Sequence, residues 1–310
     1  MIELFRLATR AVFGTRTARR DKRAGEARAS NPADGTRFLF ADKQDGKDPF
    51  EERPIFVLSA GWRAGSTLVQ RLVASGERVL LWGEPYDRAA PVQRLSASTA
   101  PFSDAWPPAG YPAPPEHLDD LSKSWTATLY PPQSALAAAH RAFMLRLFAE
   151  PARTAGAVRW GLKEVRFGHA EAVYLHALFP QASFVFVRRR IEDAWRSYRN
   201  FSGATDWYAR WPHRPVHTPY AFARHCARLQ AEFHAAAEAT GGMILDYEAL
   251  VTRQIDWSRL SALCNVEINP STLDVQVGSG RRVSAVTPID RLMLAAGGRH
   301  GRLEAFRLRP

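Results

Sequence analysis

A short glycine-bearing segment, Ala60–Thr67 (AGWRAGST), carries the first residues that could do chemistry. It follows an apolar run typical of a buried strand and precedes leucines and valines that repeat at helical spacing. Such a turn presents backbone N–H groups to an anion, and the helix dipole adds to the attraction. Arg63 would supply a cation there, and Ser66 could hydrogen-bond the anion or cap the helix. The segment therefore predicts a phosphate-binding loop.

This loop differs from the phosphate loop of nucleoside-triphosphate enzymes. That loop ends in Gly-Lys-Ser/Thr, whereas here Gly65 is followed by Ser66 and Thr67 with no lysine between them. Those enzymes also hold magnesium with an acidic residue at a neighbouring strand end. The apolar run at 183–187 ends in three arginines instead. The pattern favours anion recognition by cations and amides, without a metal ion.

The loop also carries a family resemblance. Its central residues resemble the Arg/Lys-Ser-Gly-Thr-Thr-Leu loop of sulfotransferases. In that family the loop binds the 5′-phosphosulfate of 3′-phosphoadenosine 5′-phosphosulfate (PAPS). The resemblance implies that this co-substrate is bound by Arg63, Ala64, Gly65, Ser66, Thr67 and Leu68.

A second family signature begins after the apolar run at 183–187. In sulfotransferases an Arg after a strand, an Asp four residues on and a Ser eight residues on hold the 3′-phosphate of the co-substrate. Here Arg189, Asp193 and Ser197 have this spacing. Eight residues are about two helical turns, so Ser197 returns to the side of the helix on which Arg189 lies. The resemblance implies that Arg189 and Ser197 bind the 3′-phosphate, which suits a guanidinium fork and a hydroxyl.

Two more segments resemble those of tyrosylprotein sulfotransferases, and the segment order also resembles that of bacterial carbohydrate sulfotransferases. Gly83-Glu84-Pro85 corresponds to their Gly-Glu-Glu, and Lys163–Phe167 (KEVRF) to their Lys-Asp-Pro-Phe. The resemblance covers about residues 53–255. Three positions depart from the pattern: Ala64 replaces Ser, Arg190-Ile191 replaces Asn/Asp-Pro, and Val165 replaces Pro.

The resemblance implies catalytic roles for three side chains. Glu84 would take the proton from an acceptor hydroxyl, and the alternative is a solvated carboxylate in a turn. Arg63 and Lys163 would stabilise charge on the sulfuryl and phosphate oxygens during in-line transfer. The alternative for Arg63 is an arginine on the surface without a catalytic role. The alternative for Lys163 is a salt bridge with Glu164. None of the scattered histidines has metal-ligand spacing, and His117 is the reserve base.

The elements that must position these residues alternate along the chain. Short β-rich runs predict strands, and the segments between them predict helices. This alternation predicts an α/β fold with a parallel sheet, and the resemblance implies a P-loop NTPase-like sheet flanked by helices in a single domain. The expected strands are 55–59, 79–82, 160–164, 183–187 and 243–246, and the expected helices include about 134–149, 168–179 and 219–239.

The α/β domain is expected over 53–280. Residues 1–52 are expected to be a basic tail or linker, and 281–310 a basic C-terminal segment. Residues at about 86–135 hold nine of the 21 prolines, which predicts an irregular insertion of the kind that often forms lids or binding loops. Gly278–Arg282 could be a third cofactor loop or a plain basic turn. Four aromatic residues of the insertion could stack on an acceptor or pack in the core: Trp106, Tyr111, Trp125 and Tyr130.

Most of the net charge of +11 belongs to the two ends of the chain. Residues 1–30 and 281–310 contribute +5 each, which leaves +1 for the 250 residues between them. A basic isoelectric point is typical of proteins that bind nucleic acid or anionic membranes, but the centre of the chain lacks this bias. We therefore expect no nucleic-acid partner. Residues 1–20 could form a basic amphipathic helix on a membrane surface, or a frayed basic terminus.

The composition of the chain indicates its cellular compartment and the kind of genome that encodes it. The two cysteines, Cys226 and Cys264, make neither a disulfide framework nor a metal site, which favours a reducing compartment, the cytoplasm. No run of about 18 apolar residues predicts a transmembrane helix, and arginines interrupt any signal-peptide pattern. The 37 arginines against five lysines are typical of a GC-rich bacterial genome, which favours glycan or metabolite acceptors.

The sequence as a whole predicts a PAPS-dependent sulfotransferase acting on an acceptor hydroxyl. A P-loop kinase or nucleotide-hydrolysing enzyme is the second interpretation, and the missing Gly-Lys-Ser/Thr counts against it. A non-catalytic protein that binds an anionic surface is the third, and the nearly neutral centre of the chain counts against it.

Overall fold

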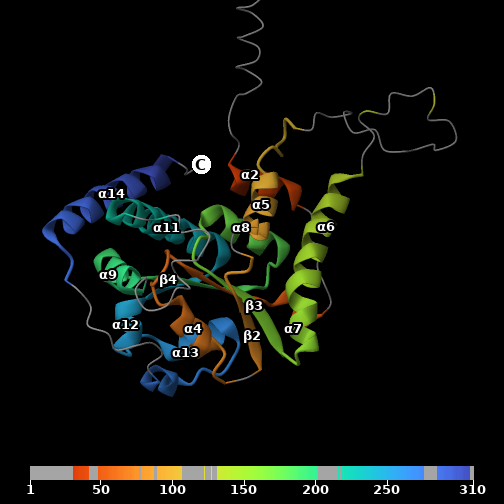
Figure 1. Ribbon diagram of the computed structural model, residues 1–310. Helices are drawn as coiled ribbons and strands as arrows, with labels where there is room; N and C mark the ends of the chain where they lie inside the picture. Colours follow the sequence, from red (N-terminus) through yellow and green to blue (C-terminus); the bar gives the residue numbers. More distant parts are fainter. Residues whose placement is uncertain are drawn as a thin grey trace, which may run out of the picture.

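Five strands form the central sheet of the computed structural model, in the order β2-β3-β1-β4-β5 (Figure 1). Every neighbouring pair of strands is parallel. The structure describes residues 31–41, 48–76, 78–86, 89–106, 122, 127, 131–201, 216, 218–275 and 285–307. The strands are β1 (Ile55–Ser59), β2 (Val79–Gly83), β3 (Arg159–Glu164), β4 (Ser183–Arg188) and β5 (Met243–Asp246).

Alternate residues of each inner strand enter two different cores. On β1, Ile55 and Val57 pack into the core on one face of the sheet, and Phe56 and Leu58 into the core on the other. Successive side chains of a strand point to opposite faces, so a strand covered on both faces appears in sequence as a continuous apolar run. All five residues of β1 are buried, which is why its segment is apolar throughout.

Helices cover both faces of the sheet, and this arrangement confirms the predicted α/β class (Figure 1). One face is covered by α4 (Ser66–Val73), α12 (Tyr247–Val251), α13 (Trp257–Cys264) and the 3₁₀ turn η4 (Pro270–Asp274). The other face is covered mainly by α8 (His169–Leu178), α11 (Pro219–Thr240) and the helical run formed by α6 (Gln133–Met144), η3 (Leu145–Ala149) and α7 (Glu150–Thr154).

The run from α6 to α7 contains a π-helical turn at η3. Pro151 follows this turn and has no N–H to donate to a carbonyl one turn earlier, so the ordinary helical hydrogen-bond pattern cannot continue through it. Helices commonly contain a single π turn where their regular hydrogen bonds are interrupted in this way. The helix predicted at about 134–149 is therefore longer than expected and changes its hydrogen-bonding pattern near its end.

Three short helices lie in stretches for which the sequence predicted no regular structure. Within the residues expected to be a tail, the structure has α2 (Pro32–Leu39) and α3 (Pro49–Glu52), and within the expected insertion it has α5 (Pro91–Ser98). Each begins with a proline, which suits the first turn of a helix. Helix α2 contacts both α5 and α8, so this part of the expected tail packs on the domain.

Two long helices pack side by side at one end of the molecule (Figure 1). Helix α11 starts at Thr218, whose hydroxyl caps it, and stops at Gly241 in the left-handed region. Helix α14 (Pro288–Arg307) runs along it, and α9 (Ile191–Phe201) contacts both. None of the described helices combines the length and the apolarity needed to cross a membrane.

Candidate active site

The predicted phosphate loop joins β1 to α4 at the carboxyl edge of the sheet, where ligands bind in open parallel sheets. Gly65 is the N-cap of α4 and has a φ of 99°, a conformation that L side chains rarely adopt. The unpaired N–H groups of the first turn of α4 therefore start at this glycine. Of the six predicted loop residues, Arg63 and Thr67 are exposed, and the buried or half-buried ones are Ala64, Gly65, Ser66 and Leu68.

The two segments predicted to bind opposite ends of one nucleotide are in direct contact. The Arg63 Nε donates a hydrogen bond to the Ser197 Oγ at 3.0 Å. The Arg189 Nη1 donates to the backbone oxygen of Arg63 at 2.9 Å. Arg63 and Ser197 are 134 residues apart in sequence, so the fold brings them together. Their predicted roles in binding stay predictions, but the residues do share one site.

Two further contacts hold Arg189 in place. Its guanidinium lies over the ring of Tyr247, 4.1 Å from the ring centroid, and its backbone oxygen accepts from the Gln230 Nε2 at 2.8 Å. Its Nε is buried and, among the described residues, has no hydrogen-bond partner. A buried donor without a partner is costly, so this N–H suits an acceptor that is not part of the chain.

Asp193, the middle residue of the predicted 3′-phosphate signature, forms ion pairs with arginines. Its carboxylate pairs with Arg190 at 2.8 Å and with Arg196 at 2.9 Å. It lies in the first turn of α9, where a negative charge also favours the helix dipole. Asp193 therefore stabilises the start of the helix that carries Ser197.

Glu84 and Lys163 form an ion pair at the same edge of the sheet. The Lys163 Nζ lies 2.5 Å from the Glu84 Oε1, and the Glu84 backbone N–H donates to the Lys163 oxygen at 2.8 Å. The Glu84 side chain is 20% exposed and the Lys163 side chain 8%, so solvent screens the attraction between their charges little. Glu84 has a φ of 25°, which is strained for any residue with a Cβ. Such strain is concentrated at functional sites.

The salt bridge considered between Lys163 and Glu164 does not form. Glu164 pairs instead with Arg166, whose Nε and Nη2 lie 2.9 and 2.7 Å from its two oxygens, and it accepts the Val165 N–H at 2.8 Å. Burial raises the pKa of Glu164, and these hydrogen bonds oppose that effect. Lys163 and Glu164 are neighbours on a strand, so their side chains point to opposite faces.

His225 and Tyr247 belong to this site and were missed by sequence reasoning. Burial, together with the positive charge of Arg228, lowers the pKa of His225 to about 4. Its ring stacks on Trp62 of the loop with centroids 4.9 Å apart, and it donates a hydrogen bond to the Val165 backbone. Each comes from an element far along the chain, and nothing in its local pattern signals a contact with the loop. The one available signal was the position of Tyr247 directly after a predicted strand, because ligands bind at the carboxyl ends of parallel strands.

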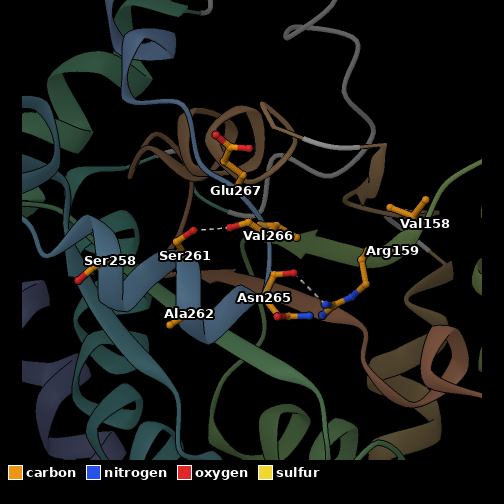
Figure 2. Close-up of a pocket in the computed structure, with 8 residues that line it drawn as sticks. All are labelled: Val158, Arg159, Ser258, Ser261, Ala262, Asn265, Val266 and Glu267. Carbon is orange, nitrogen blue, oxygen red and sulfur yellow. Dashed lines mark hydrogen bonds between the residues drawn. The ribbon is translucent and has the colours of Figure 1, made fainter.

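A cavity lined by polar and apolar residues lies elsewhere. It has a volume of about 720 Å³, and Figure 2 shows it lined by the start of β3 and by α13 with the residues after it. Val158 and Arg159 are at the amino end of β3, whereas the phosphate loop follows the carboxyl end of the parallel strand β1. The Arg159 guanidinium there donates to the backbone oxygens of Arg53 and Asn265. This cavity is therefore at the opposite edge of the sheet from the candidate site.

Several predicted candidates lie outside the described residues. Of the insertion aromatics, Trp106 is described and is 44% exposed. Within the described ranges, no group of three or more His, Cys, Asp or Glu side chains could hold a metal ion. The undescribed candidates are residues 1–20, Tyr111, His117, Trp125, Tyr130 and Gly278–Arg282.

Taken together, the carboxyl edge of the sheet combines a loop of backbone donors, two arginines, a hydroxyl and a carboxylate–ammonium pair. Donors and cations of this kind stabilise anionic groups and the charge that develops on them during group transfer. A carboxylate beside them can accept a proton from a nucleophile. The arrangement therefore suits transfer of an anionic group between oxygen atoms.

Comparison with known proteins gives the same result. A family model described as the sulfotransferase family matches residues 54–269, more than half of the chain. Among solved structures, a sulfotransferase from Alicyclobacillus acidocaldarius is similar, with 14% identity and a TM-score of 0.42, over 83% of this chain and 97% of that one. No curated protein matches the sequence. The match over the segment that contains β1 to β5 shows that this chain belongs to the sulfotransferase family.

Proposed function

We propose that the protein transfers a sulfuryl group from PAPS to an acceptor hydroxyl, with glycans and small metabolites as the favoured acceptors. The observation that carries the proposal is the contact between the phosphate loop and the Arg189–Ser197 segment. Two anion-binding segments that touch suit one ligand with an anionic group at each end. PAPS has its phosphosulfate on the 5′ carbon of the ribose and a phosphate on the 3′ carbon.

The residues at each end fit these groups. The N–H groups at the start of α4 and the Arg63 guanidinium suit the 5′-phosphosulfate, and Gly65 leaves room for the backbone to approach it. The unpartnered Arg189 Nε and the Ser197 hydroxyl suit the 3′-phosphate. The Arg63–Ser197 hydrogen bond would then be replaced by hydrogen bonds to the ligand, so binding leaves no donor unpaired.

The proposed chemistry assigns a role to each remaining side chain. Glu84 removes the proton of the acceptor hydroxyl as the oxygen attacks sulfur in line with the bond to the leaving phosphate. Lys163 orients the Glu84 carboxylate through their hydrogen bond and places positive charge beside the sulfuryl oxygens. The bond from sulfur to the phosphate oxygen breaks as the bond from sulfur to the acceptor oxygen forms. Positioning and electrostatics supply most of the acceleration.

The proposal also includes a reducing compartment, the cytoplasm. Both cysteines, Cys226 and Cys264, are buried and unpaired. Burial raises the pKa of each thiol, which makes them unreactive core residues. A cytoplasmic enzyme would meet its nucleotide co-substrate directly.

Calorimetry with 3′-phosphoadenosine 5′-phosphate, in the absence of magnesium, tests the nucleotide site. We expect the wild-type chain to bind, and Arg189→Ala to weaken binding by about 2 kcal/mol, roughly 30-fold, because charge-assisted hydrogen bonds are lost. Arg190→Ala is the matched control, since this neighbouring arginine is 74% exposed and pairs with Asp193 and Glu248. Absence of binding, or binding of ATP only with magnesium, would overturn the proposal. An equal loss in both variants would show a general effect of charge.

A further inference from the structure

Helix α14 has two faces of different character, and its inner face is fully committed to α11. Methyl groups on Gly297 and Gly301 would overlap the backbone oxygens of Tyr220 and Arg224, so the two helices approach as closely as glycine permits. Leu294 and Ala305 are buried on the same side. The described residues of this face are therefore already in contact with another helix of the molecule.

The outer face of α14 is apolar and exposed. Ile289 is 71% exposed, Leu292 72%, Leu303 58% and Phe306 61%. At 100° per residue these four side chains fall within about 100° of arc, so they form one stripe along the helix. In Figure 1 the helix lies at the outside of the molecule, with α11 on its inner side. Contiguous exposed apolar side chains mark sites of interaction with proteins or membranes.

Three exposed arginines accompany this stripe without acidic partners. Among the described residues, no carboxylate forms an ion pair with Arg299, Arg302 or Arg307, whereas the two acidic residues of the helix are already paired. Asp290 lies 2.8 Å from Arg199, and Glu304 binds Arg224. By the same helical geometry, Arg299 lies within the stripe and the other two lie at its borders. The outer face is therefore apolar and cationic at once.

We propose that the outer face of α14 binds an anionic lipid surface. Long apolar side chains can enter the headgroup region while arginine side chains reach its phosphates, the arrangement of helices that lie in the membrane interface. Charge repulsion counts against two other occupants of this face, a second copy of the chain and the N-terminal segment. A symmetric contact with a second copy would place three arginines near three others, and residues 1–30 carry a charge of +5. This inference is independent of the proposed sulfotransfer.

Sedimentation of the full chain with vesicles tests the proposal. We expect binding to phosphatidylcholine vesicles that contain about a third phosphatidylglycerol, and weak or no binding to pure phosphatidylcholine. Each arginine near an anionic surface adds about 1 kcal/mol, so R299Q/R302Q/R307Q should lower the partition coefficient on the order of 100-fold. The pair L292E/L303E should abolish binding. Val251→Glu is the matched control, because this valine is 44% exposed on α12.

Two further measurements separate the alternatives. The unfolding temperature of each variant should match that of the wild-type chain, since the changed side chains are exposed. Replacing Arg6, Arg10 and Arg16 with Gln tests the N-terminal segment, and this variant should keep most of the binding. The proposal is overturned if the α14 variants bind like the wild-type chain, if the N-terminal variant alone abolishes binding, or if L292E/L303E instead converts a dimer to a monomer in light scattering.

Discussion

At the scale of single residues, the pair of Glu84 and Lys163 concentrates most of the proposed chemistry. The carboxylate is held at 2.5 Å from an ammonium group, and its backbone is in a strained conformation. A residue held in such a conformation is fixed by its surroundings, which suits a group that must meet a reacting atom in one orientation.

Glu84→Gln separates the proton-transfer role from the structural one. The amide oxygen can still accept from Lys163, so the fold and nucleotide affinity should be kept within about twofold, whereas turnover should fall by about 10²–10⁴ because an amide accepts no proton. Turnover is measured as release of 3′-phosphoadenosine 5′-phosphate from PAPS with a panel of glycans and phenols. Glu267→Gln, an exposed carboxylate at the opposite edge of the sheet, should behave as the wild-type chain. Retained turnover in Glu84→Gln would move the base elsewhere.

At the scale of elements, the junction between β1 and α4 depends on a contact made by α12. The first residue of α12, Tyr247, packs against Gly65, and the Arg189 guanidinium lies over its ring. The loop and the Arg189 segment are therefore supported by the same aromatic ring.

Gly65→Ala should destabilise the fold and weaken nucleotide binding together. The new methyl group would be strained at a φ of 99° and would also overlap the Tyr247 ring. Strain and overpacking together should cost about 2–5 kcal/mol. Gly241→Ala is the matched control, since Gly241 has a φ of 65° and no neighbour within 4 Å. It should cost only about 1–2 kcal/mol and leave affinity unchanged. Equal costs in urea unfolding would refute the packing argument.

Strands β1, β2, β4 and β5 could be predicted because each contains an apolar run that differs from its surroundings. Helix α14 gave no such signal, because its buried positions are mainly glycine and alanine and its large apolar side chains face outward. Helices α2, α3 and α5 are short and largely polar. Apolar periodicity therefore detects helices that bury large side chains and misses those that pack through small ones.

The site was predictable to the extent that its residues lie in local motifs. Arg63, Arg189 and Ser197 were found because the strand-to-helix junctions that carry them resemble two sulfotransferase motifs. The only partner that the sequence suggested for Lys163 was its neighbour Glu164. The register of β2 on β3 places Gly83 beside Lys163 and so brings Glu84 to it instead. His225 could not be found, because its environment is made by the loop and β3.

At the scale of the whole molecule, the partly buried His225 couples global stability to pH. In the folded chain its pKa is about 4, whereas in the unfolded chain it should titrate near 6.5. Between these values the unfolded state binds more protons, so stability falls as the pH falls from about 6.5 to 4. The difference corresponds to roughly 3 kcal/mol.

His225→Gln should remove this part of the pH dependence. Unfolding free energies from urea titrations at pH 7 and pH 4.5 give the measurement, and the decrease between the two should be smaller in the variant by about 2–3 kcal/mol. His234→Gln, at an exposed histidine of the same helix, should keep the wild-type decrease. An unchanged decrease in His225→Gln would show that His225 is already accessible to protons in the folded chain.

The shared support of the two anion sites by Tyr247 has a consequence for discrimination among cellular nucleotides. The loop and Arg189 contact the same ring, and Arg189 also donates to the Arg63 backbone oxygen, so we expect the spacing between the two proposed anion sites to be fixed. A nucleotide without a 3′-phosphate would satisfy the loop and leave the buried Arg189 Nε without an acceptor. On the proposed assignment, ATP and adenosine 5′-phosphosulfate would lack the hydrogen bond that a 3′-phosphate gains from Arg189, so the site would prefer PAPS over both.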